Sequence, residues 1–151
     1  MRYALSLMLL LVLPLTGRVL AEDELKPAEV LAKIRNMDLK FTKGAEETVR
    51  TEKELLTFDQ GKDEVIWLRT YPGDAKIIQV YEIVKDRMSV KDGVVIIPLK
   101  WVSMANPSEM NYNPDKHDVG IKVSKKDGKF EVIFYAIDTQ GVEADITFSE
   151  P

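Results

Sequence analysis

Residues 119–137, VGIKVSKKDGKFEVIFYAI, indicate the fold class of this chain. Apolar side chains alternate with small or polar ones from Val119 to Ser124, and the run from Lys129 to Ile137 is rich in β-branched and aromatic residues, as strands are. Asp127-Gly128 lies between the two runs, and Asp-Gly is a preferred sequence for a two-residue type I′ hairpin turn. The segment therefore predicts two antiparallel strands joined by a tight turn.

The same pattern of strand and turn recurs from residue 63 to the end of the chain. The further predicted strands are 65–71 before Pro72-Gly73, 76–84, 88–90 and 94–104 on either side of Asp92-Gly93, and 142–148 after Gly141. Successive strands joined by tight turns run antiparallel. We therefore expect a mainly β domain, a single antiparallel meander of about seven strands that forms a small barrel or a sandwich.

The N-terminal part of the domain predicts one helix. Pro27 suits a first helical turn, and Val30, Leu31 and Ile34 recur at helical spacing, which predicts a short amphipathic helix over 27–37. If the sheet stays open, the alternative is an α+β fold with this helix packed on one curved sheet.

Residues 46–58 fit either a helix or a strand, because their apolar side chains match both periods. Thr51 and Thr57 favour a strand that ends in the turn Asp59-Gln60-Gly61, which is our interpretation. No internal repeat or low-complexity segment interrupts the predicted domain.

Several predicted strands are apolar on both faces, which means that something must cover the second face. They are 65–71, 77–84, 94–102 and 130–137. The helix or closure of the sheet would suffice, and a bound ligand or partner is the alternative. A cavity inside the sheet would favour a ligand, whereas a filled interior with an apolar outer patch would favour a protein. Pro98 cannot donate to a ladder, so we expect an edge strand or a bulge at that position.

Residues 1–21 predict a secretory signal peptide. A positive start at Arg2 precedes the apolar run Leu5–Leu15, and Val19-Leu20-Ala21 forms the expected cleavage site. We expect a single mature domain, 22–151, in the periplasm or, alternatively, outside the cell. The chain has no cysteine, so we expect no disulfide and no lipid-modified residue, and no later apolar run predicts a membrane anchor.

The charge and the residue inventory argue against two classes of function. The net charge is −4 and becomes more negative without Arg2 and Arg18, which argues against nucleic acid as a partner. With one histidine, no cysteine, no nucleophile elbow and no HExxH pair, we expect a protein that is not an enzyme.

Two sets of residues are candidate sites. Met104, Met110 and His117 offer thioethers and an imidazole that suit Cu(I), and with Trp101 they are similar in type to the residues of periplasmic copper carriers. We expect no cofactor, with copper as the alternative. The second set comprises candidate ligand or partner contacts, in which a cation lies among aromatic side chains: Trp67, Arg69, Tyr71 and Trp101.

These observations predict a non-enzymatic binding protein, whose partner is a hydrophobic small molecule or an envelope protein. A periplasmic copper carrier and an inhibitor of a secreted enzyme are the alternatives. In architecture the predicted domain resembles lipocalin-like and other small periplasmic barrels, but no motif allows residue roles to be transferred.

Overall fold

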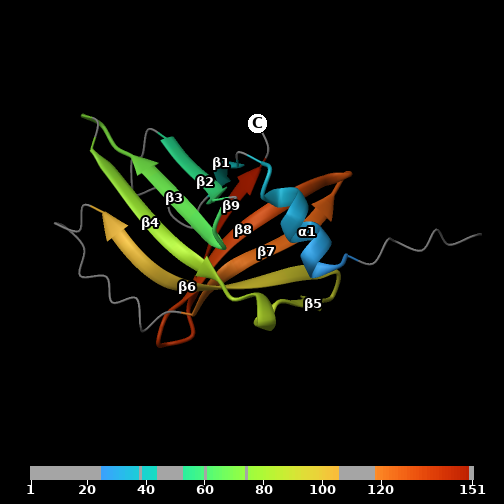
Figure 1. Ribbon diagram of the computed structural model, residues 1–151. Helices are drawn as coiled ribbons and strands as arrows, with labels where there is room; N and C mark the ends of the chain where they lie inside the picture. Colours follow the sequence, from blue (N-terminus) through green and yellow to red (C-terminus); the bar gives the residue numbers. More distant parts are fainter. Residues whose placement is uncertain are drawn as a thin grey trace, which may run out of the picture.

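The computed structural model describes residues 25–37, 39–43, 53–59, 61–73, 75–105 and 118–149. Nine strands pair antiparallel in one sheet, and pairing of β4 with β6 closes eight of them into a barrel (Figure 1). The strands are β1 (Leu39–Lys43), β2 (Lys53–Asp59), β3 (Glu64–Thr70), β4 (Lys76–Ile83), β5 (Ser89–Lys91), β6 (Val94–Ala105), β7 (Asp118–Lys126), β8 (Lys129–Ile137) and β9 (Glu143–Ser149). The predicted mainly β meander with a short helix is confirmed, in its barrel form.

Each barrel strand pairs with the strand before it in the chain, except that β5 lies outside the barrel and pairs only with β6. The interpretation of residues 46–58 as a strand is confirmed for 53–59, which form β2. β1 was not predicted. Its residues Leu39 to Thr42 do alternate apolar and polar side chains, and the strand fills the gap between β2 and β9 and so closes the barrel.

The two predicted Asp-Gly turns have the backbone that their sequence requires. Asp92 and Asp127 both adopt φ of +52°, followed by Gly93 at +75° and Gly128 at +80°. Positive φ at both central residues is the signature of a type I′ turn, whose twist matches that of the flanking strands.

Helix α1 (Pro27–Ile34) covers one end of the barrel, beside β5 and the short 3₁₀ helix η1 (Lys85–Arg87) (Figure 1). Val30, Leu31 and Ile34 are buried in the same cluster as the barrel interior, so the helix closes that end. It is shorter than the predicted 27–37, because the next residues turn tightly through bonds such as Met37 N to Ile34 O, 3.0 Å. Among the residues described, no helix is long and apolar enough to cross a bilayer.

Pro98 lies at a local edge of β6, which is one of the two arrangements expected for it. It pairs with Gly120 of β7, whereas on its other side the described pairings with β5 end at Ile96 and those with β4 begin at Leu99. The bulge of β6 lies farther along, where Val80 and Tyr81 of β4 pair with Ser103 and Trp101. Pro98 faces the gap between β4 and β5, where its carbonyl accepts a hydrogen bond from Val84 N at 3.0 Å. A missing donor is tolerated there because no strand continues β4.

The barrel centre is packed with aromatic rings. Phe134 of β8 contacts Trp67 of β3 and Tyr81 of β4, with ring centroids 4.9 and 5.2 Å apart, and Phe148 of β9 lies 6.2 Å from Trp67. These side chains are at most 7% exposed. The interior is therefore filled through its middle and at the end covered by α1.

Candidate functional site

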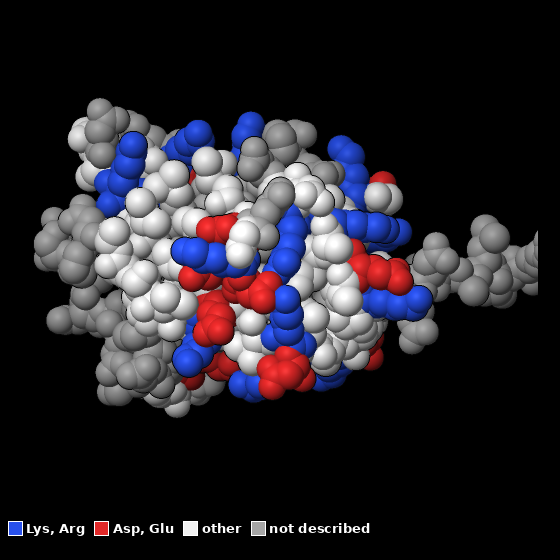
Figure 2. Space-filling model, in the orientation of Figure 1, with Lys and Arg blue, Asp and Glu red and all other residues white. Residues whose placement is uncertain are grey.

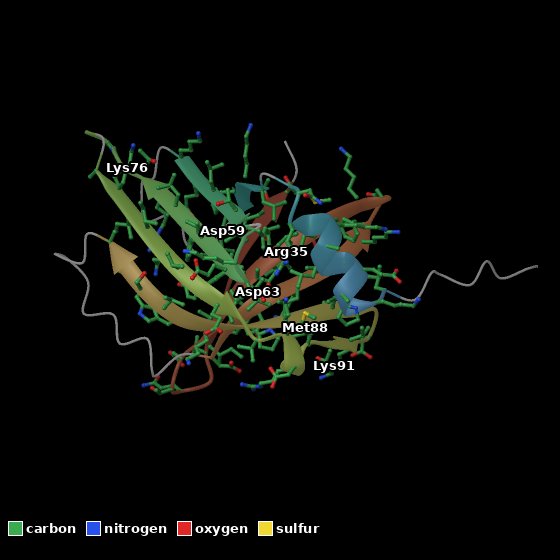
Figure 3. The ribbon with its side chains drawn as sticks, in the orientation of Figure 1. Arg35, Asp59, Asp63, Lys76, Met88 and Lys91 are labelled. Carbon is green, nitrogen blue, oxygen red and sulfur yellow. The ribbon has the colours of Figure 1, made fainter. Side chains whose placement is uncertain are left out.

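The inner wall of the barrel becomes more exposed towards the end away from α1, which we call the far end. Lys76 at the start of β4 marks this end in Figure 3, and Arg35, Asp63 and Met88 mark the side of α1. On every barrel strand except β7, the inward-facing residue nearest the far end is more exposed than those deeper inside. On β1, for example, Leu39 is 0% exposed whereas Phe41 is 39% exposed.

Two small residues contribute to this exposure. Ala136 of β8 and Ala144 of β9 are paired in register and continue the inward-facing rows of Phe134 and Ile146. Ala136 is half-buried and Ala144 is exposed. On this side of the far end, the inner wall therefore carries only small side chains.

A polar cluster lies across from these alanines, on β2, β3, β4 and β6. It comprises Glu54, Trp67, Arg69, Gln79, Tyr81 and Trp101, and we call it the Arg69 cluster. All six residues face the interior, because the strand registers align Glu54 with Arg69, Trp67 with Gln79, and Tyr81 with Trp101. Alternation along paired strands thus gathers side chains that are far apart in sequence.

Arg69 is at the centre of the cluster. Its Nη2 donates to Gln79 Oε1, and its guanidinium lies over the Trp67 ring, 4.4 Å from the centroid. Gln79 is only 3% exposed, and its Nε2 donates to Tyr81 Oη at 3.2 Å. The Nε of Arg69 is buried and has no hydrogen-bond partner among the residues that the structure describes. An unsatisfied buried donor is unusual in a native structure and calls for an explanation.

The two indole rings of the cluster have different contacts. Trp67 Nε1 donates to Glu54 Oε2 at 3.2 Å, which fixes the ring on which the guanidinium lies. Trp101 packs edge-on against Tyr81, with centroids 5.5 Å apart. The cluster therefore combines one cation, one carboxylate and aromatic surface on a wall that is partly exposed.

The residues predicted as ligand or partner contacts are largely brought together. Trp67, Arg69 and Trp101 all belong to the cluster. Tyr71 instead follows β3 at the Pro72-Gly73 turn, where its backbone N donates to Ala75 O at 2.8 Å, and it makes none of the cluster's contacts described above.

The predicted copper set is only partly described. Met104 is half-buried on the inner wall, opposite Gln79 of β4, whereas Met110 and His117 lie outside the described residues. Within those residues, no group of three or more His, Cys, Asp or Glu side chains is placed to hold a metal ion.

Sequence reasoning missed Glu54, Gln79 and Tyr81. Gln79 carried a usable signal, since it interrupts the apolar run Lys76–Val84 on the same face as Tyr81, and a polar residue in such a run needs a buried partner. Glu54 carried none, because only the register of β2 against β3 places it beside Arg69.

The outer wall carries a second feature, an apolar surface on β2, β3, β4 and β6. Its side chains are half-buried, apart from Val102 at 47% exposure: Leu55, Ile66, Leu68, Ile78, Val80 and Val102. Cross-strand register places them in adjoining rows. We call this the outer apolar face, and Figure 2 shows few charges over its part of β4 and β6.

A charged group lies elsewhere on the outer wall, on β7 and β9. Lys122 contacts Glu143 and lies 3.7 Å from Asp145. The Lys122 hydrogen bond lowers the pKa of Glu143, whereas partial burial raises the pKa of Asp145. The shared lysine accounts for the proximity of these two carboxylates as an ion-pair network.

Comparison with family models, curated proteins and solved structures finds no match to this chain. Its function is therefore inferred from its own geometry.

Proposed function

We propose that this protein binds a small, largely apolar molecule at the far end of the barrel. The observation that carries the proposal is the burial gradient on the inner wall, where Phe41 is 39% exposed and Ala144 is exposed although both face inward. Soluble barrels keep inward-facing apolar side chains from water unless a ligand or another element covers them.

The shape and chemistry of this end suit such a ligand. The packed rings of Trp67, Tyr81 and Phe134 form its floor, so the molecule would occupy only the outer part of the interior. Ala136 and Ala144 present only small side chains on one side, and Arg69 supplies a polar contact on the other. Apolar walls with a few placed polar groups are typical of small-molecule sites.

N-phenyl-1-naphthylamine, a neutral apolar fluorophore, tests this proposal. Its emission should rise on binding, and the emission of Trp67 and Trp101 should fall through energy transfer. Ala144→Phe places a ring into the space beside Ala136 and should weaken binding about tenfold or more, by occlusion. Ala28→Phe, at an exposed position on α1 at the other end, is the matched control.

The outer apolar face is the competing binding surface for this probe, so Leu68→Glu distinguishes the two. Loss of binding in Leu68→Glu with retention in Ala144→Phe would contradict the proposal and place the fluorophore outside the barrel. No binding by the unaltered protein would also contradict it.

A second candidate function, binding of a protein partner, is favoured by the outer apolar face. Val102 is 47% exposed, and the middle of the barrel interior is filled by other side chains. Contiguous apolar surface on a soluble protein commonly marks an interaction site. An envelope protein would be such a partner if residues 1–21 direct export, which remains a proposal.

Site-specific photo-crosslinking in the source cells tests this candidate. A benzophenone side chain at Val102 should give one adduct of defined mass, whereas the same group at the exposed Lys125 of β7 should give none. The same adducts from both positions would indicate random collision and would argue against a docking surface.

A further inference from the structure

We propose that the ligand of the far end carries a carboxylate and that Arg69 binds it. This inference rests on the proposed function, because it concerns the head group of the same small molecule. It also identifies the ligand class as an amphipathic acid, with an apolar body against the aromatic floor and a charged group at the Arg69 cluster.

The charges on the inner wall favour an anionic group on the ligand. Among the described inward-facing side chains of the far end, Arg69 is the only cation and Glu54, aligned with it on β2, is the only anion. Lys125 has an inward-facing register on β7, but it lies at the opposite end of the barrel, over Phe130. Glu54 Oε2 accepts the indole N–H of Trp67, and Arg69 takes part in none of the ion pairs found among the described residues. A half-buried guanidinium held by a neutral amide favours the approach of an anion.

The hydrogen bonding of Arg69 also favours an anion. Nη2 donates to Gln79 Oε1, whose side chain is in turn fixed by Tyr81 Oη. Nε is buried and finds no acceptor within the described part of the chain, which costs free energy in the unliganded protein. A small displacement of the neighbouring side chains that admitted an acceptor to Nε would remove this cost, and a bound anion would supply that acceptor.

The planar shape of the Arg69 guanidinium also favours a carboxylate. Trp67 lies against one face of the guanidinium, 4.4 Å from ring centroid to Cζ, so that an anion must approach along an edge of the planar group. The edge formed by Nε and an Nη presents two parallel N–H groups, which match the two oxygens of a carboxylate. A hydroxyl offers one oxygen and no charge, so an alcohol of equal length should gain much less.

The test is competition of decanoate and decanol against N-phenyl-1-naphthylamine, both below their aggregation concentrations. In the unaltered protein, decanoate should compete at a concentration about ten- to a hundredfold lower than decanol, as expected for a charge-assisted bidentate contact. Arg69→Gln should abolish this difference, measured as the ratio of the two competing concentrations within the same variant. Lys76→Gln, which removes a cation from the outer surface of the same end, should preserve it (Figure 3).

Arg69→Lys provides an independent reading, since it keeps the charge but lacks the planar fork, and should retain only part of the preference. It also serves if Arg69→Gln does not fold. Equal competition by decanoate and decanol in the unaltered protein would overturn the inference while the proposed function stands. An equal loss of both competitors in the arginine variants would overturn it too, since Arg69 would then act through packing. If the fluorophore and both decyl compounds all fail to bind, the proposed function itself fails.

Discussion

Gly120 of β7 has no room for a side chain, because the ring of its cross-strand neighbour Tyr135 lies against it. A Cβ at Gly120 would lie 2.5 Å from Tyr135 Oη and 2.6 Å from Cζ. Tyr135 is on the outer wall, yet it is only 6% exposed, and Lys122 Nζ lies 5.1 Å from its ring centroid. The glycine thus lets an aromatic ring pack flat on the outside of the sheet.

We expect Gly120→Ala to destabilise the protein by about 1–3 kcal/mol, the usual cost of forcing an extra methyl into a packed site. In the Tyr135→Ala background the same substitution should cost much less, because the ring is gone and alanine suits a strand better than glycine. Urea unfolding of the four proteins measures both values. Equal costs in the two backgrounds would show that Tyr135 does not set the space at Gly120.

At the scale of elements, Asp63 ties α1 to the barrel. It follows β2 in the turn before β3, and its carboxylate contacts Arg35 just after α1 and Lys85 of η1, the latter at 2.7 Å (Figure 3). The hydrogen bonds from Lys85 and then Arg35 lower the pKa of Asp63 below its ordinary value of 3.8. These two ion pairs therefore make a pH-dependent contribution to the stability of the contact between α1 and the barrel.

The sign of that contribution follows from the lowered pKa. The folded state holds Asp63 ionised more readily than the unfolded chain does, so its stabilisation is complete above the ordinary pKa of 3.8 and is lost as the pH falls through the lower folded value. Asp63→Asn should be less stable than the unaltered protein at pH 7, and the difference should shrink as the pH falls below about 4.

Urea unfolding between pH 7 and pH 2 measures this, with Asp92→Asn as the control. Asp92 is an exposed acid at the same end, and Asn-Gly keeps the turn chemistry. A stability difference for Asp63→Asn that stays constant down to pH 2 would show that the effect is not electrostatic.

The elements that were predicted share one property, a turn or a period that is visible in a short window. The Asp-Gly hairpins and the amphipathic stripe of α1 are local signals, and they were predicted correctly. β1 was missed although Leu39, Lys40, Phe41 and Thr42 alternate apolar and polar side chains, because this run is short. Pro98 marked a position where β6 has no partner strand on one side, because a missing donor is tolerated there, whereas the bulge near Ser103 carried no such signal.

At the scale of the whole molecule, barrel closure depends on two pairings, β4 with β6 and β1 with β9. Both join strands that are not linked by a tight turn, so the sequence was equally compatible with a barrel and a sandwich. The candidate site could also be predicted only in part, because it too depends on long-range strand pairing. Aromatic residues near a cation predicted Trp67, Arg69 and Trp101, whereas Glu54 and Gln79 join them only through long-range register.

The packed centre of the barrel makes Phe134 the best single test of the whole fold. Its ring is 2% exposed between Trp67 and Tyr81, so Phe134→Ala should cost about 3–5 kcal/mol, the range for deleting a buried ring. Leu68→Ala, on the half-buried outer apolar face, is the control and should cost clearly less. Thermal unfolding at two protein concentrations measures both.

The control also tests the outer apolar face. If Leu68 is covered only by solvent in the isolated protein, the cost of Leu68→Ala is small and independent of concentration. A cost that grows with protein concentration would mean that the face is buried between copies of this chain, since association stabilises the folded state by mass action. A loss at Leu68 equal to that at Phe134 would contradict the division of the barrel into a packed interior and a solvated outer wall.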